Sequence, residues 1–200
     1  MTAPLSQQIA VAAAAMVVED GLDYAEARRR AALEVGGARL RSHELPRHEQ
    51  IEDEVRAHIA IYHADTQPVE LRGLRELALR WMQRLAAHRP HLGGAVWRGT
   101  ATRRSAILID LYCDDPKAAE IDLVNQGIDY DTGGDTEADG RGVLILTVAD
   151  RSPAFDDPVT IHLLLHDLDD LRGALKPDAQ GRSWRGPLAA VQRSLDGAAP

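Results

Sequence analysis

The chain has 200 residues and a formal net charge of −8 at pH 7, which is enough length for a helical region and a small α/β domain. The negative charge is concentrated in residues 93–200, which contain 18 Asp and Glu but only 11 Lys and Arg. Nucleic-acid binding is not expected, because the release of counterions from nucleic acid needs clustered cations. The single Cys113 excludes an internal disulfide, and no apolar run approaches the roughly 20 residues of a membrane span. No Lys or Arg precedes Arg28, so the charged start of a signal peptide is missing. We therefore expect a cytoplasmic protein that does not enter a membrane.

Residues 1–90 predict about four helices joined by short loops. Apolar residues recur at helical spacing in residues 4–20, 51–62 and 71–85. Asp23 is placed to cap another helix, which would run to about Val35 and stop at the glycine pair that follows. These residues therefore form a helical N-terminal region in our prediction.

Four histidines fall in and around the helix predicted over residues 51–62: His43, His48, His58 and His63. Their spacings of 5, 10 and 5 residues do not match a ligand pattern such as H-E-x-x-H. We interpret them as exposed or partly exposed side chains and predict no metal site from them.

The pattern changes at residue 93, where short β-type runs begin to alternate with turns. Strands are predicted over residues 95–98, 106–113, 128–131, 143–149 and 159–166, with a turn or loop over residues 132–142. Asp115 followed by Pro116 is typical of a helix start, and this helix should run to about residue 126. Further helices are predicted over residues 167–175 and 187–195. The order of these elements indicates an α+β fold.

The segment Gly93–Asp115 reads GGAVWRGTATRRSAILIDLYCDD. Its glycine pair, loop and following strand resemble the signature of the polymerase-beta-like nucleotidyltransferase superfamily. In that family an Asp-x-Asp pair on the strand holds the metal ions that carry a nucleotide's phosphates. The equivalent positions in this chain, counted from the glycine pair, are Ala106 and Leu108, so the metal pair is absent.

The resemblance implies a nucleotidyltransferase-like domain over residues 91–176, with a mixed β-sheet and flanking helices. The helical region of residues 1–90 would pack on it, and residues 177–200 would form a C-terminal extension with a short helix. The resemblance also implies a nucleotide-binding loop near the triphosphate. Its candidate residues are Gly93, Gly94, Arg98, Gly99, Thr100, Arg103 and Arg104.

Asp110 is the leading catalytic candidate, because alternate residues of a strand share a face and Asp110 shares the face of Leu108. Asp114 has the same parity, but four strand residues span about 13 Å, too far to share a metal without a bend. His162 and His166 occupy the strand where the family carries a third carboxylate, with Asp167 at its end. Mg²⁺ would be the cofactor if the protein is active, although hard Mg²⁺ prefers oxygen ligands to imidazole.

The resemblance and the candidate residues lead to three functional hypotheses. The leading one is a catalytically degenerate nucleotidyltransferase-like protein that acts as a nucleotide- or partner-binding module. The first alternative is an active Mg²⁺-dependent nucleotidyltransferase that uses Asp110 with Asp114 or Asp167. The second is a protein-interaction module, in which the apolar N-terminal helices form a homodimer.

Overall fold

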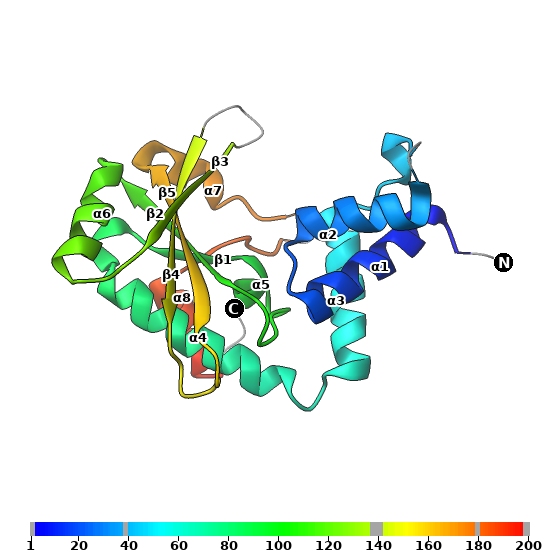
Figure 1. The fold of residues 1–200 in the computed structure, drawn as a ribbon, viewed down its shortest axis with the longest axis horizontal. Helices are drawn as coiled ribbons and strands as arrows, with labels where there is room; N and C mark the ends of the chain where they lie inside the picture. Colours follow the sequence, from blue (N-terminus) through cyan, green and yellow to red (C-terminus); the bar gives the residue numbers. More distant parts are fainter. Residues whose placement is uncertain (1–2, 38–39, 137–141, 179–180, 198–200) are drawn as a thin grey trace. The chain divides into compact units, whose positions relative to one another are not determined.

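The computed structural model describes residues 3–37, 40–136, 142–178 and 181–197. The chain divides into two compact units (Figure 1). The helical unit comprises residues 1–70 and 100–105, and the sheet unit comprises residues 71–99 and 106–200. The division falls inside helix α4 (Gln67–Arg84), whereas the sequence suggested a boundary at residue 90.

The helical unit is built on α1 (Leu5–Asp20), α2 (Tyr24–Ala31) and α3 (His48–Tyr62). Asp23 caps α2 as predicted, because its carboxylate accepts from the backbone N–H groups of Ala25 and Glu26. The helix predicted to reach Val35 is α2 followed by a π-helical turn (Ala32–Gly36), and a 3-10 turn (Ser42–Glu44) precedes α3. The buried core is rich in alanine, which lets the helices approach closely: Ile9, Ala10, Ala13, Ala14, Val17, Val18, Ala27, Ala31, Ala32, Ile51, Val55 and Ile59.

A short segment from later in the chain, residues 100–105, completes the helical unit. The Thr100 hydroxyl lies 3.0 Å from the hydroxyl of Tyr24, and the Gln67 amide donates to the Ala101 carbonyl at 2.9 Å. The Thr102 hydroxyl donates to the Val18 carbonyl at 3.4 Å. Both threonines are buried, so residues 100–102 of this segment belong to the packed interior of the helical unit.

The sheet unit contains a six-stranded mixed sheet in the order β3-β4-β5-β2-β1-β6. Only the β2–β5 pair is parallel among the described strands. The strand bounds are β1 His91–Gly93, β2 Ile107–Cys113, β3 Asp131–Thr136, β4 Gly142–Asp150, β5 Val159–Asp167 and β6 Gly186–Pro187. The accompanying helices are α5 (Gly94–Arg98), α6 (Pro116–Asn125), α7 (Leu171–Ala174) and α8 (Leu188–Leu195), and this arrangement confirms the predicted α+β class.

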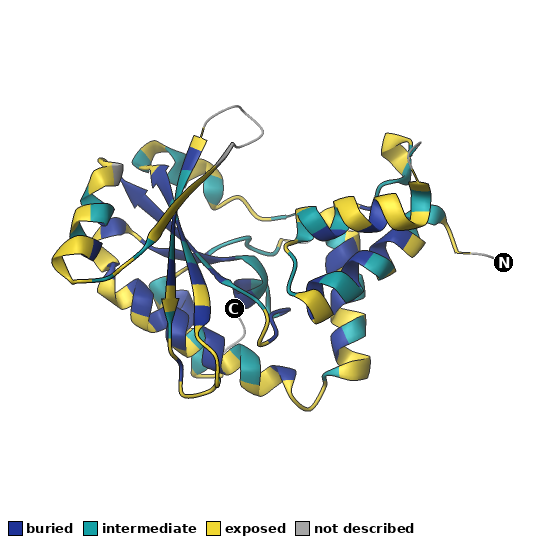
Figure 2. Ribbon diagram, viewed as in Figure 1, coloured by how far each residue is buried: buried dark blue, intermediate teal, exposed yellow. Residues whose placement is uncertain are grey.

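Strand β2 lies inside the sheet between β5 and β1 and is buried on both faces (Figure 2). Ile107, Ile109 and Leu111 line one face, whereas Asp110 and Tyr112 are buried on the other. The near-continuous apolar run in the sequence therefore corresponds to a strand that is covered on both faces. This strand also places the carboxylate of Asp110 in the interior of the sheet unit.

Three predicted elements differ from the structure. Residues 95–98 were expected to form a strand, but they belong to α5, and the strand that precedes them is β1. The reason is the turn at Gly94, whose φ of +60° is in the left-handed region that favours glycine, and where a Cβ would lie 2.8 Å from Leu108 Cδ1.

The brief strand expected over residues 128–131 and the loop expected over 132–142 are also displaced. Residues 131–136 form β3, in which Gly133 pairs with Ile145 and Gly134 with Leu144. Ladder hydrogen bonds to β4 need only the backbone, so a Gly-rich segment can still form this edge strand. Residues 137–141 of the expected loop lie outside the described residues.

No helix in the described parts of the chain is both long enough and apolar enough to cross a bilayer.

Candidate functional site

Asp110 is the centre of a buried polar cluster in the sheet unit, and its side chain is 4% exposed. Its Oδ1 accepts from His166 Nε2 at 2.7 Å and from Arg185 Nη2 at 3.2 Å. Its Oδ2 accepts from Arg185 Nε at 2.7 Å. The guanidinium of Arg185 thus contacts both oxygens, which is the strong fork geometry of arginine with a carboxylate.

The strand pairing explains how three distant residues meet. Asp110 and His166 lie on the parallel strands β2 and β5, where Tyr112 pairs with His166 and Asp110 with Leu164. Arg185 precedes β6, which is joined to β2 through β1. Gly93 also lies beside this cluster, because a Cβ built on it would be 3.1 Å from Asp110 Oδ2.

The surroundings of Asp110 have opposing effects on its ionisation. Burial acts to raise the pKa of the carboxyl group. The hydrogen bonds from His166 and Arg185, and their charges, outweigh burial and hold the pKa of Asp110 below its ordinary value. Asp110 is therefore a carboxylate at neutral pH, stabilised by groups of this chain.

Two further aromatic rings, those of His91 and Tyr112, extend the cluster to one side of His166. The rings of His91 and Tyr112 meet edge to face with centroids 5.4 Å apart, and those of Tyr112 and His166 stack at 5.2 Å. All three residues are buried. His91 Nδ1 lies 2.9 Å from the Arg89 carbonyl, so it donates to the backbone. The arrangement fixes the ring of His166 in the position from which it reaches Asp110.

These residues do not fit the Mg²⁺ ions that the resemblance implies. Mg²⁺ takes oxygen ligands, yet the groups beside Asp110 are a guanidinium and an imidazole. Asp110 belongs to no group of three metal-ligating side chains within the described part of the chain. Asp114, the second catalytic candidate, is 78% exposed and lies 3.9 Å from Arg89. Asp167 is also exposed, and its carboxylate accepts from the backbone of Asp169.

His162, the other histidine of β5, is not part of the Asp110 cluster. Its Nδ1 lies 3.0 Å from the Thr147 hydroxyl on β4. Burial lowers the pKa of this imidazole, which favours its neutral form.

The residues predicted to bind nucleotide fall into two groups. Gly93, Gly94, Arg98 and Gly99 belong to the sheet unit, whereas Thr100, Arg103 and Arg104 belong to the helical unit. The side chain of Arg98 is only 6% exposed, pairs with the buried carboxylate of Asp178 at 3.0 Å and covers the ring of Trp184 at 4.4 Å.

Arg98 therefore holds the C-terminal segment in place, and Gly99 ends α5 in the left-handed region. Thr100 is buried against Tyr24, so its hydroxyl faces the protein interior. Arg103 and Arg104 are exposed, and the backbone N–H of Arg103 donates to Glu70 at 2.9 Å. These two arginines are the predicted anion contacts whose side chains reach the surface.

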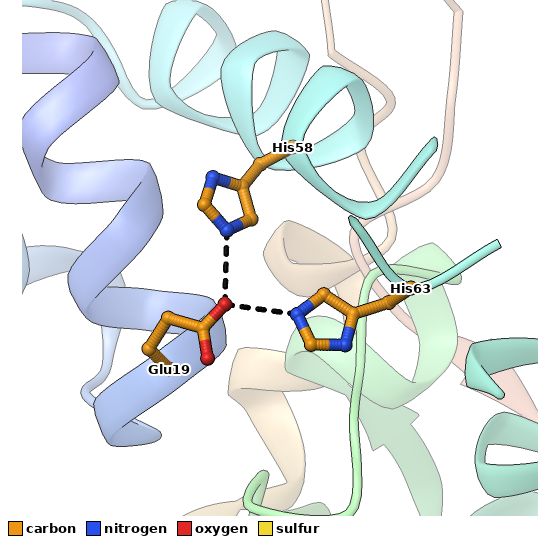
Figure 3. Close-up of side chains that lie close together, drawn as sticks. All are labelled: Glu19, His58 and His63. Carbon is orange, nitrogen blue, oxygen red and sulfur yellow. Dashed lines mark hydrogen bonds and ion pairs between the residues drawn. The ribbon is translucent and has the colours of Figure 1, made fainter. Parts of the chain in front are cut away.

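A second cluster, which the sequence did not indicate, lies in the helical unit and consists of Glu19, His58 and His63 (Figure 3). Glu19 Oε1 lies 3.0 Å from His58 Nε2 and 2.9 Å from His63 Nε2. Hydrogen bonds from His63 and His58 lower the pKa of Glu19. The cluster borders a cavity of about 540 Å³ whose other lining residues are Val11, Ala14, Ala15, Glu54, Ala57, Ile61 and Tyr62.

The spacing of the histidines along the chain does not indicate this cluster, for two reasons. His63 lies just past the end of α3, so the helical spacing rule does not apply to it. Glu19 comes from α1, and no local pattern shows that α1 packs on α3. The other two histidines of this region, His43 and His48, are exposed as predicted.

Comparisons with protein families, with curated proteins and with solved structures find no match to this chain.

Proposed function

We propose that the sheet unit is a nucleotidyltransferase-like module that has lost transfer activity and that the protein acts as a nucleotide-binding module. One observation carries the loss of activity: both carboxylate oxygens of Asp110 accept hydrogen bonds from Arg185 and His166. Metal-assisted phosphoryl transfer needs carboxylates that are open to cations. Here the cationic partner is a side chain of the same chain.

The proposed nucleotide contacts are Arg103 and Arg104. Of the arginines in the predicted loop, Arg98 is held in a buried ion pair, whereas these two are exposed. A guanidinium binds phosphate oxygens through paired N–H groups and needs no metal ion. Binding should therefore be independent of Mg²⁺.

The test is the melting temperature of the full chain with ATP, GTP, CTP or UTP, each with and without Mg²⁺. A ligand that binds the folded state raises the melting temperature by mass action. We expect a rise without Mg²⁺ that is lost in the Arg103→Gln/Arg104→Gln double variant. The matched control is Arg47→Gln/Arg193→Gln, which removes two other exposed arginines, one from each unit.

Other outcomes of the same experiment reject the proposal. No rise with any nucleotide at millimolar concentration would exclude nucleotide binding. A rise that requires Mg²⁺ and disappears in Asp110→Asn would support the active transferase instead. A rise that persists in the Arg103→Gln/Arg104→Gln variant would place the nucleotide elsewhere.

A homodimer through the helical unit is a second candidate, because apolar side chains are exposed there. Val11, Ile61 and Tyr62 are 49%, 71% and 68% exposed, and all three line the same cavity. Exposed apolar surface of this kind often marks a protein contact. Light scattering after size exclusion should show a dimer that Ile61→Lys converts to monomer; a wild-type monomer at high concentration would reject this candidate.

A further inference from the structure

The cluster of Glu19, His58 and His63 has the ligand chemistry of a transition-metal site. It contributes two imidazole nitrogens and one carboxylate, and the three ligand atoms lie within 4.8 Å of one another. A His–His–Glu set is typical of zinc sites that keep one coordination position open. In the described part of the chain it is the one such group of three.

The geometry is close to that of a bound ion. Two ligand atoms of a tetrahedral Zn²⁺ ion, each about 2.0–2.1 Å from the metal, lie about 3.3 Å apart. Glu19 Oε1 is 3.0 Å from His58 Nε2 and 2.9 Å from His63 Nε2, so a small withdrawal of the carboxylate would admit an ion. The Glu19 side chain is 50% exposed and has room for this movement.

The two histidines are held in place by α3, which carries His58 and ends just before His63. The backbone N–H of His63 donates to the Ile59 carbonyl at 2.8 Å, which fixes the residue at the end of α3. The ring of His58 lies 4.7 Å from that of Tyr62 and 6.1 Å from that of His63. The side chains of His58 and His63 are 18% and 27% exposed, so both remain within reach of a metal ion from solvent.

The cavity supplies the fourth position. It is bordered by the three ligands, by apolar side chains such as Val11 and Ile61, and by Glu54. The Gln7 amide donates to the Glu54 carboxylate at 2.6 Å, which holds that side chain in place. Water or a small ligand could therefore occupy the remaining coordination position.

We propose that Glu19, His58 and His63 bind a divalent transition-metal ion of the zinc type, with the fourth coordination position open to the cavity. The ion links α1 to α3, so its binding stabilises the helical unit. This inference is independent of the proposed nucleotide binding, because it rests on different residues and a different ligand.

The experiment uses the full chain without a polyhistidine tag, stripped with EDTA and then desalted. Titration calorimetry with Zn²⁺ at pH 7.5 should show saturable binding of one ion per chain. Co²⁺ should give the visible absorption bands of a four-coordinate site. Mg²⁺, which prefers oxygen ligands, should not compete.

The variants assign the ion to the cluster. His58→Gln and His63→Gln should each weaken Zn²⁺ binding at least 10-fold, and His43→Gln, which changes an exposed histidine of the same unit, should leave it unchanged. Glu19→Gln keeps both imidazoles and should also weaken binding. Circular dichroism tests whether each variant is folded. A variant that fails this test is replaced by the Asn substitution at the same position.

Two results would overturn the proposal. One is the absence of saturable Zn²⁺ binding at micromolar concentration, which would leave the cluster as a hydrogen-bonded contact between helices. The other is binding that His58→Gln, His63→Gln and Glu19→Gln leave unchanged, which would make the ion adventitious.

Discussion

The Asp110→Asn substitution tests whether Asp110 is a structural centre or an acid available for catalysis. Asn has nearly the shape of Asp, so the change removes the charge and replaces one accepting oxygen with an NH₂ donor. That donor would face the N–H groups of Arg185 or His166, which now donate to Asp110. We expect a large loss of stability.

The magnitude follows from the burial of the partners. Removing one member of a buried ion pair costs about 3–5 kcal/mol, because the remaining charge loses its compensation. The Asp110 and His166 side chains are almost fully buried, but that of Arg185 is 29% exposed and recovers part of its hydration. The lower end of the range therefore applies, and we expect the free energy of unfolding to fall by about 3 kcal/mol, or the melting temperature by about 10 °C.

Tryptophan fluorescence measures this change in the sheet unit alone, since Trp81, Trp97 and Trp184 all belong to it. Urea unfolding followed with excitation at 295 nm supplies the free energy. Asp114→Asn is the control, because it makes the same chemical change at a carboxylate that is 78% exposed, where about 0.5 kcal/mol or less is expected. If Asp110→Asn were neutral or stabilising, the cluster would not be structural and the proposed loss of transfer activity would lose its basis.

Three further measurements test other features of the sheet unit. The pKa of Asp110 lies below its ordinary value of 3.8, so the ionised carboxylate stabilises the fold above about pH 4, and this stabilisation is lost as the pH falls through the folded-state pKa. The urea midpoint should therefore fall more steeply below pH 4 in the wild type than in Asp110→Asn. Parallel curves for the two proteins would contradict this. Gly186→Ala should lower the free energy of unfolding by about 1–3 kcal/mol, because a Cβ there would overlap the ring of Trp97; an unchanged midpoint would show that the ring moves aside freely. Burial raises the pKa of the Cys113 thiol, so Ellman's reagent should react with it slowly in the folded protein and rapidly in 6 M guanidinium; fast reaction of the folded protein would mean that this end of β2 opens readily.

Local patterns in the sequence predicted much of the fold. The apolar run at Ile107–Cys113 is β2, and the residues with helical spacing near the N-terminus form α1 and α3. The cap at Asp115 was also predicted, and its carboxylate accepts from the backbone N–H of Lys117. Such signals depend on residues close together in the chain, which is why they can be identified without a structure.

The contacts that define the two clusters could not be predicted in this way. Arg185 is 75 residues from Asp110, and His58 is 39 residues from Glu19. The meeting of these side chains is set by strand order and helix packing, for which the sequence carries no local signal. The short α5 was mistaken for a strand because a few apolar residues fit either structure, and only the turn at Gly94 decides between them.

The segment of residues 100–105 that completes the helical unit has a consequence for the order of folding during synthesis. Chains emerge from the ribosome with the N-terminus first, and their units generally fold as they appear. Here the contacts of Tyr24, Val18 and Gln67 with residues 100–102 form only after that segment has been made, by which point β1 has already been synthesised. The helical unit should therefore remain incompletely packed while the first strand of the sheet unit is synthesised. A nascent chain halted at residue 70 should be digested by protease faster than the same helices in the finished protein.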